Sequence, residues 1–326
     1  MVTIANIDLD DGAYVEWAGF VGDVPMFATA DGDVIRVEGG QTVLSIHDGL
    51  LCAELVQSGD ALLTGGEDGK VCRINSDGIS TVLTDLEDSW IDQIAAGPNG
   101  AIAFASGRNA TIIIDDKIAS EISLERTIEG LAFAPKGMRL ALARYDGVEL
   151  HWVTSGGSTQ VLEWKGAHTG VCFSPDGKYV VSNMQENALH GWRLKDARHM
   201  RMQGYPSKVK SISWSPKGKW LATSGAPAAI VWPFTGKDGP MGKAPKELGS
   251  MGKLQVTCVA CHPTEEAIVI GYSNGMILIV KIEDGQEVPL RSEGKGAITS
   301  LNWNKQGTQL AFGSEQGEGG IIDVTS

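Results

Sequence analysis

A self-similar stretch of about forty residues recurs along this chain of 326 residues and limits its fold more than any other feature. The clearest copy is residues 209–234, VKSISWSPKGKWLATSGAPAAIVWPF, which holds three short runs of β-branched and aromatic residues. A tight turn, Pro216-Lys217-Gly218, separates the first two runs. Runs this short, bounded by glycine and proline, predict antiparallel strands rather than helices.

Eight copies of this repeat follow one another, with 37 to 47 residues between equivalent first-turn positions. Those positions are Gly22, Gly59, Gly100, Gly137, Gly177, Gly218, Glu265 and Gly307. A weaker fourth run follows most copies, for example TVLSI from Thr42 and EVPL from Glu287. The sequence therefore predicts an all-β fold built from four-stranded sheets.

The turns and tryptophans of these repeats resemble those of the WD40 repeat family. The resemblance is carried by the SPDG turn that ends at Gly177, by Asp-Gly or Asn-Gly turns before third strands, and by Trp152, Trp192 and Trp232. It covers essentially the whole chain, although no Trp-Asp dipeptide occurs. The family's buried Asp-His-Ser-Trp network is therefore expected to be incomplete in most repeats.

The resemblance implies one β-propeller domain over residues 1–326, with eight four-stranded blades. Pairing of residues 2–9 with the last blade, at residues 320–324, would close the ring and leave no open sheet edge. Seven blades are the alternative, which would require one repeat, most plausibly the first, to be something else.

Charge and cysteine content restrict the partners and the compartment. The formal net charge is −13, which disfavours nonspecific binding to nucleic acid or to an anionic membrane. Residues 1–150 hold 25 acidic and 9 basic side chains, a balance of −16, whereas residues 151–326 carry +3. This imbalance either aids solubility or steers a basic partner. Five cysteines at strand positions, with no secretion signal or bilayer-length apolar stretch, predict free thiols and a cytoplasmic protein.

Two surfaces are candidates for docking a protein partner. In propellers, the loop that enters each blade and the loop between its second and third strands share one rim, and the repeat register assigns seven residues to it. They are Glu67, Trp90, Arg144, Tyr145, Glu186, Lys208 and Tyr272. The second surface is a predicted surface insertion, residues 235–253, which is rich in glycine and lysine and includes Lys237, Met241 and Lys243.

The stretch Cys258-Val259-Ala260-Cys261-His262 spells the motif of covalent haem attachment. The repeat register accounts for it without haem, because Cys261 takes the position of Trp214 and His262 that of Ser215. Alternation along a strand should turn Cys258 and Cys261 to opposite faces, which disfavours a zinc site. We therefore expect no cofactor and no metal.

No nucleophile–base pair or carboxylate pair converges in the repeat register, so the sequence does not predict an enzyme. The resemblance implies a non-enzymatic scaffold that docks a protein partner on a rim. The alternative is a metal- or small-molecule-binding propeller that uses the channel mouth or Cys258 and Cys261.

Overall fold

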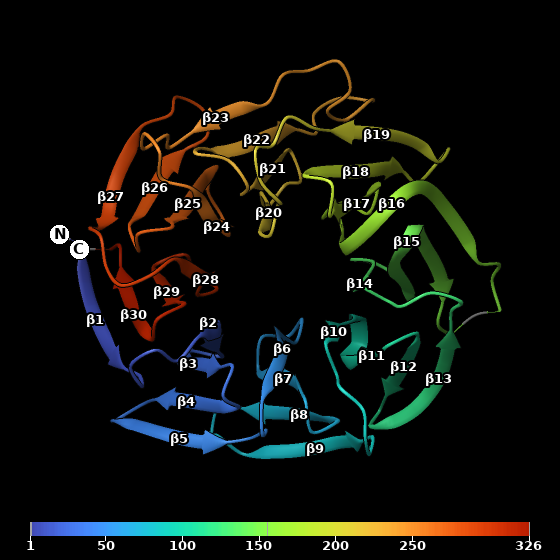
Figure 1. Ribbon diagram of the computed structural model, residues 1–326, viewed down its shortest axis with the longest axis horizontal. Coiled ribbons are helices and arrows are strands. Elements are labelled where there is room, and N and C mark those ends of the chain that lie inside the picture. The colour runs from blue at the N-terminus through green and yellow to red at the C-terminus, as the bar shows by residue number, and fades with distance from the viewer. Residues whose placement is uncertain (1, 155, 326) are drawn as a thin grey trace. The chain divides into compact units, whose positions relative to one another are not determined.

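The computed structural model describes residues 2–154 and 156–325 and is built almost entirely of antiparallel strands (Figure 1). The only helical element in these residues is a short 3-10 turn, Pro98–Gly100. Within the described residues, no helix has the length and apolar character needed to cross a membrane. The all-β prediction is confirmed.

The strands form seven hydrogen-bonded sheets, six of four strands and one of six. The first three are β2 (Val15–Val21), β3 (Val24–Thr29), β4 (Asp33–Val37) and β5 (Gln41–Ser45); β6 (Leu50–Leu55), β7 (Ala61–Gly66), β8 (Lys70–Asn75) and β9 (Ser80–Asp85); and β10 (Gln93–Ala96), β11 (Ile102–Ser106), β12 (Asn109–Ile114) and β13 (Lys117–Ser123). The six-stranded sheet holds β14 (Gly130–Phe133), β15 (Arg139–Trp152), β16 (Gln160–Phe173), β17 (Tyr179–Met184), β18 (Ala188–Arg193) and β19 (Arg198–Met202).

The remaining three sheets come from the C-terminal part of the chain and from its first strand. They are β20 (Ile212–Trp214), β21 (Trp220–Thr223), β22 (Ala229–Pro233) and β23 (Lys246–Leu248); β24 (Val256–Cys261), β25 (Ala267–Tyr272), β26 (Ile277–Lys281) and β27 (Glu287–Arg291); and β28 (Ile298–Trp303), β29 (Gln309–Ser314), β30 (Glu318–Asp323) and β1 (Thr3–Asp8). The strands form two compact units, residues 1–30, 35–42 and 205–326 in unit 1 and residues 31–34 and 43–204 in unit 2.

The sheet that contains both chain ends confirms the predicted pairing of residues 2–9 with the last repeat. Strand β1 pairs antiparallel with β30, with Thr3 opposite Asp323 and Asp8 opposite Glu318. Figure 1 shows the blue β1 beside the red β30, with the N and C labels next to each other. The first strand thus supplies the outer strand that the last repeat lacks.

Seven sheets match the alternative count, but the reason differs from the one expected from the sequence. The first repeat forms an ordinary four-stranded sheet, and the fourth and fifth repeats share the six-stranded one. Strand β15 folds back on itself at Asp146 and Gly147, which have φ angles of 67° and 146°. A hydrogen bond from Val153 N–H to Met138 O, at 2.9 Å, shows that its two halves pair with each other. The first part of β16 pairs with β15 and its second part with β17, so one long strand joins two repeats.

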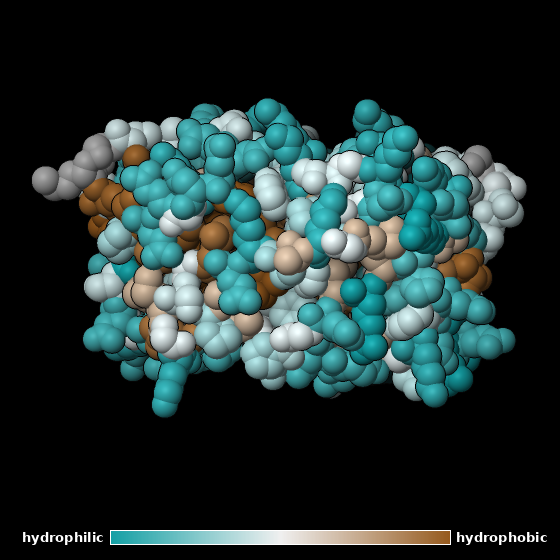
Figure 2. Space-filling view, turned by 90° about the horizontal axis from the view of Figure 1, so that it is seen from above, coloured by the Kyte–Doolittle hydropathy of each residue, from teal (hydrophilic) through white to brown (hydrophobic). Residues whose placement is uncertain are grey.

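Apolar packing between neighbouring sheets follows the repeat. The second strands of two sheets, β7 and β25, are buried at every residue, whereas the outer strands β9 and β13 are mostly exposed. In unit 2, Leu63, Val71 and Phe104 belong to one buried cluster, and in unit 1 Ile270 and Leu278 belong to another. Most of the surface visible in Figure 2 is hydrophilic, with hydrophobic residues in small areas between, as is ordinary for a folded protein.

Candidate functional site

Buried polar networks occupy the interior of three repeats. His47 contacts Thr64 Oγ1 through Nε2 at 2.9 Å and Asp68 Oδ1 through Nδ1 at 2.9 Å. His168 Nδ1 lies 2.7 Å from Ser182 Oγ, in the corresponding position of the fifth repeat.

The third network replaces histidine by tyrosine. Trp232 Nε1–H donates to Tyr205 Oη at 2.6 Å, and Tyr205 Oη lies 2.8 Å from Thr223 Oγ1. The second-strand position filled by Thr64, Ser182 and Thr223 is apolar in the other repeats, where it holds Phe27, Phe104, Leu142, Ile270 and Phe312. The expected loss of the network in most repeats is confirmed, and what remains stabilises the fold.

Trp90 in unit 2 is the most exposed aromatic side chain in the described residues, at 64%. Its loop is held by backbone hydrogen bonds at both ends, from Leu86 N–H to Gly69 O at 3.0 Å and from Ile91 N–H to Gly66 O at 3.0 Å. The adjacent Ile91 is fully buried and anchors the loop to the core. The backbone therefore fixes the loop while the indole of Trp90 projects into solvent.

Acidic side chains occur between β7 and β8, at Glu67, and before β10 and β14, at Asp92 and Glu129. Glu67 is exposed, and its backbone N–H donates to Gly49 O at 2.9 Å. Partial burial, together with the neighbouring Glu129, raises the pKa of Asp92. In residues 2–154 and 156–325 we find no ion pair between Glu67, Asp92 or Glu129 and a basic side chain. These carboxylates are therefore available to a basic partner.

Sequence reasoning missed Asp92 and Glu129, although the repeat register contained the signal. Each follows a buried isoleucine whose backbone N–H is bonded to the preceding repeat loop, Ile91 and Ile128. The two carboxylates thus occupy the same position of neighbouring repeats. Comparing that one position between repeats would have found the pair.

Arg144 and Tyr145 lie together at the fold of β15. Arg144 Nε donates to Glu149 Oε1 at 2.7 Å, and its Nη1 donates to Tyr145 O at 2.8 Å. Tyr145 is 46% exposed, and the guanidinium of Arg126, which the sequence reasoning did not select, lies 6.0 Å from its ring centre. Glu186 is exposed, and its carboxylate accepts from Ala167 N–H at 3.2 Å. Arg144 is thus committed to an internal ion pair, whereas the Tyr145 ring is partly exposed and lies beside Arg126.

The predicted residues of unit 1 have different environments. Lys208 is half-buried and borders a pocket of about 530 Å³, which is also lined by Lys210, Gln255 and Glu315. Tyr272 is fully buried, and its hydroxyl donates to Gly249 O. The prediction that Tyr272 docks a partner is wrong, because the tyrosine closes the interior of its sheet instead of lying on the rim.

The predicted insertion at residues 235–253 is only partly a surface loop. Residues 246–248 form β23, the outer strand of their sheet, which pairs with β22. Pro240 is buried, and Lys243 Nζ contacts Thr235. Lys237 is exposed and Met241 half-buried. The boundaries 235–253 therefore need correction, because the extra length lies before β23, at residues 235–245.

Cys258 and Cys261 belong to different packing layers. Cys258 joins a cluster with Ala260 and Leu301, whereas Cys261 packs against the cluster that contains Ile270. Burial raises the pKa of Cys258 to about 11 and that of Cys261 to about 12, so both remain neutral thiols. No disulfide bond joins any of the five cysteines, and no group of three metal-ligating side chains occurs among the described residues.

His262 has a turn-capping role that other repeats assign to serine or asparagine. Its Nδ1 accepts from Glu265 N–H at 3.0 Å, while Ser215 Oγ accepts from Trp220 N–H at 3.1 Å in the preceding repeat. Asn304 Oδ1 accepts from Thr308 N–H at 2.9 Å in the next repeat. The side chain at this position satisfies the orphan amides of the turn, which accounts for the histidine of the Cys-x-x-Cys-His stretch.

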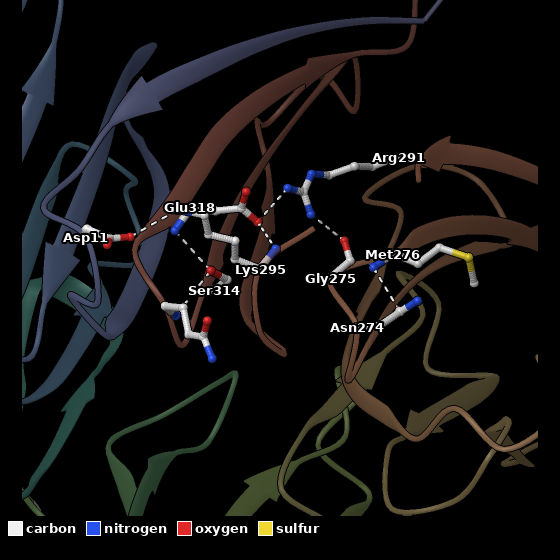
Figure 3. Close-up of polar contacts among 9 residues, drawn as sticks. Asp11, Asn274, Gly275, Met276, Arg291, Lys295, Ser314 and Glu318 are labelled. Carbon is white, nitrogen blue, oxygen red and sulfur yellow. Dashed lines mark hydrogen bonds and ion pairs between the residues drawn. The ribbon is translucent and has the colours of Figure 1, made fainter. Parts of the chain in front are cut away.

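An ion-pair network stabilises the junction of β27 with the closing sheet (Figure 3). Arg291 Nη2 lies 2.8 Å from Glu318 Oε2, and the same guanidinium also contacts Gly275 O. Glu318 N–H donates to Ser314 Oγ at 3.0 Å, and Lys295 Nζ lies 3.1 Å from Asp11 Oδ1. Although Glu318 is partly desolvated, its bonds to Arg291 and Lys295 lower its pKa. Because these groups are paired internally, the network serves the fold.

Glu54 on β6 is a titratable group that the sequence did not single out. It borders a pocket of 340 Å³ in unit 2, with Gln57, Leu131 and Phe133 among the lining residues. Burial raises the pKa of Glu54 to about 7, against the effect of a hydrogen bond from the backbone of Ala96. Its charge therefore changes near neutral pH.

Comparisons with known proteins agree with this architecture. Residues 198–231 match the family model "WD domain, G-beta repeat". A solved structure, the C-terminal WD40 domain of Sif2, superposes with a TM-score of 0.75 over 99% of both chains at 13% identity. The computationally designed Ika8 protein superposes with a TM-score of 0.76 over 97% of this chain and 98% of that chain, at 18% identity.

Three curated relatives match over part of the chain. They are Telomerase protein component 1 of Mus musculus (23% identical, 62% of this chain, 8% of the relative), Protein groucho of Drosophila melanogaster (23%, 54% and 26%) and Transcriptional corepressor LEUNIG_HOMOLOG of Arabidopsis thaliana (26%, 68% and 29%). The matched region spans less than a third of each relative's length. Together with the sheet topology, these findings show a match to a WD40 repeat at residues 198–231 and a β-propeller fold for the chain.

Proposed function

We propose that this chain is a non-enzymatic protein-interaction module that docks a protein partner through the loops of unit 2 around Trp90. The observation that carries the proposal is the 64% exposure of the indole on a loop whose backbone is fixed at both ends. Tryptophan is enriched among residues that dominate binding energy, and a fixed loop loses little conformational entropy on binding.

The charge around Trp90 supports a basic partner. Asp92 and Glu129 are close enough for Glu129 to raise the pKa of Asp92, and the first 150 residues carry a balance of −16. An approaching cationic surface would relieve this repulsion and would be steered by the field. The same negative charge is unfavourable for nucleic acid and for anionic membranes, so we propose a protein as the partner.

The WD40-type fold also supports an interaction role, and we extend the proposal to the compartment. Five cysteines without disulfide bonds are compatible with a reducing compartment such as the cytoplasm. Microscopy of the tagged protein in its host tests the location, and a signal confined to an oxidising compartment would contradict it.

Affinity purification with quantitative mass spectrometry tests the docking role. We expect Trp90→Ala to lose at least one protein that the wild type captures, with an unchanged melting temperature. Trp152→Ala, which removes another partly exposed tryptophan (43%), is the matched control and should retain that protein. If the captured proteins are the same for all three forms, the proposed site is wrong.

A further inference from the structure

We infer that residues 76–90, which comprise β9 and the turn and loop on either side of it, accept an extended basic segment of a partner protein as an additional strand of the β6–β9 sheet. This inference rests on the proposed function and specifies how the partner binds. It concerns the outer edge of the sheet next to the Trp90 loop. The occupant is an extended segment with lysine or arginine at its ends.

Strand β9 presents an open edge with little protection. It is the terminal strand of its sheet, and in the described part of the chain no further strand pairs with its outer side. Its sequence, STVLTD, contains no lysine, arginine or proline, and its first three residues are exposed. Unpaired backbone groups on such an edge can pair with another chain, and proteins usually block them with lysine, proline or bulges.

Other outer strands carry the blocking residues that β9 lacks. Strand β27 contains Pro289 and Arg291, and β19 contains Arg198 and Arg201. A bulge does not distinguish the strands. Val71 and Cys72 of β8 face Thr84 and Val82, which leaves Leu83 as an extra residue, and the register of β26 with β27 shifts in the same way.

Two further outer strands also lack lysine and proline, but their surroundings differ. Gln41 at the start of β5 already donates to Asp8 O, at the end of β1, at 2.8 Å. Neither β1 nor β5 leads into an exposed tryptophan. The combination of an unblocked edge with an exposed indole next to it therefore favours β9.

The charge of the segment selects the occupant. Residues 76–90 contain four acidic side chains, Asp77, Asp85, Glu87 and Asp88, and no basic one. All four are exposed. If a second copy of this chain paired through β9, the acidic residues at the two ends of one β9 strand would face those of the other. Repulsion between these carboxylates disfavours self-association. A segment with cationic ends would meet carboxylates at both ends of β9.

The apolar contacts are spaced along the same edge. Ile79, Val82 and Trp90 are 62%, 54% and 64% exposed. Regular pairing is expected from Ile79 to Val82, before the bulge at Leu83. Alternating β-branched residues of an added strand would pack beside Val82, since cross-strand pairs are the unit of sheet stabilisation. The basic end would then lie against the acidic residues that lead to Trp90.

Fluorescence anisotropy with a synthetic peptide tests the inference. The probe is Lys-Lys-Thr-Val-Thr-Val-Thr-Val-Lys-Lys with a fluorescent label. We expect saturable binding to the wild type that weakens as salt is added. A probe with glutamate in place of each lysine, and one with proline in place of each threonine, should not bind, because the first reverses the charge and the second removes backbone donors.

Two matched protein variants locate the binding edge. Val82→Lys places a charge on β9, and Val288→Lys places the same charge on β27, where the valine is 44% exposed. We expect Val82→Lys to weaken probe binding at least about tenfold and Val288→Lys to change it less than about twofold. Circular dichroism with thermal melting verifies that both variants fold.

The outcomes separate this inference from the proposed function. If the wild type does not bind the lysine probe, if the proline probe binds equally well, or if both valine variants behave alike, strand addition at β9 is wrong. Capture of a host protein that depends on Trp90 but not on Val82 would then leave the docking role standing without this mode of binding. Loss of that capture in both Val82→Lys and Trp90→Ala, but not in Val288→Lys, supports both.

Discussion

The β6–β9 sheet and the β24–β27 sheet have the same antiparallel plan but different chemistry at equivalent positions. Thr64 is the partner of Ala53 in the first sheet, and Ile270 is the partner of Val259 in the second. One residue further along the first strand, the equivalent residues are Glu54 and Ala260. The first sheet therefore has a polar and titratable interior where the second is apolar.

Their outer strands differ in the same direction. Strand β27 is blocked by Pro289 and by charged residues at both ends, whereas β9 is uncharged before Asp85. Both sheets have a buried second strand and tight turns, which the repeat therefore requires. The interior position of Thr64 and Ile270 and the residues of the outer edge are free to vary. Variation at free positions is where one repeat can acquire a role that its neighbours lack.

The largest expected effect tests the apolar interior of the second sheet. Ile270 is fully buried in the cluster that contains Val259 and Leu278, so Ile270→Ala leaves a cavity and should lower the free energy of unfolding by about 4 kcal/mol. Denaturant unfolding measures it. A loss below about 1 kcal/mol would show that this position is not core.

The next effect depends on pH and belongs to the first sheet alone. The pKa of Glu54 is about 7 in the folded protein and near 4.5 in the unfolded chain, so folding favours the protonated form. The contribution of Glu54 to the free energy of unfolding is fully present below pH 4.5 and is lost as the pH rises through 7. The change in the free energy of unfolding caused by Glu54→Gln should therefore be more favourable at pH 8 than at pH 4, by up to about 3 kcal/mol.

Ala260→Gln is the matched control for this pH effect, because Ala260 has the equivalent position and no charge to lose. Its effect on unfolding, whatever its size, should be the same at pH 4 and pH 8. Equal pH dependence of the wild type and Glu54→Gln would contradict the assignment of the raised pKa to Glu54.

The polar network of the first sheet should give a smaller loss. His47→Ala leaves Thr64 and Asp68 without their shared partner, and a buried polar group without a partner costs about 1–3 kcal/mol. We expect a loss of about 2 kcal/mol by denaturant unfolding. The double variant with Thr64→Val should recover part of that loss, and simple additivity of the two changes would argue against a coupled network.

The smallest expected effect concerns the two edges. Val82→Lys and Val288→Lys both alter exposed residues of outer strands, so each should change the free energy of unfolding by less than about 0.5 kcal/mol. A larger loss for Val82→Lys would mean that Val82 packs in the core and would remove β9 as a free edge.

Most of the fold could be predicted from the sequence because the repeat is a local signal. The turn glycines, the short apolar runs and the additional strand at residues 2–9 can all be recognised in the amino-acid sequence. The union of two repeats through β15 and β16 was not, since a strand that folds back at Asp146 and Gly147 resembles any other hairpin in sequence. The position of β23 was also missed, because Lys246–Leu248 is short and follows a glycine-rich stretch.

The candidate site could be predicted only in part. Exposure of Trp90 and Tyr145 followed from their loop positions, but Tyr272 has the same kind of position and turns inward to reach Gly249 O. The direction of a side chain at a strand end depends on contacts with the neighbouring repeat. The sequence of one repeat alone does not contain that information. The raised pKa of Glu54 likewise depends on burial contributed by distant strands.

Hydrogen exchange measured by mass spectrometry, with and without the lysine probe, tests the central claim about β9 most directly. We predict that a peptide covering residues 76–86 exchanges more slowly when the probe is bound, while one covering residues 284–294, which contains β27, is unchanged. Protection at β27 but not at β9, or no protection at either edge under conditions that saturate the probe, would contradict the account.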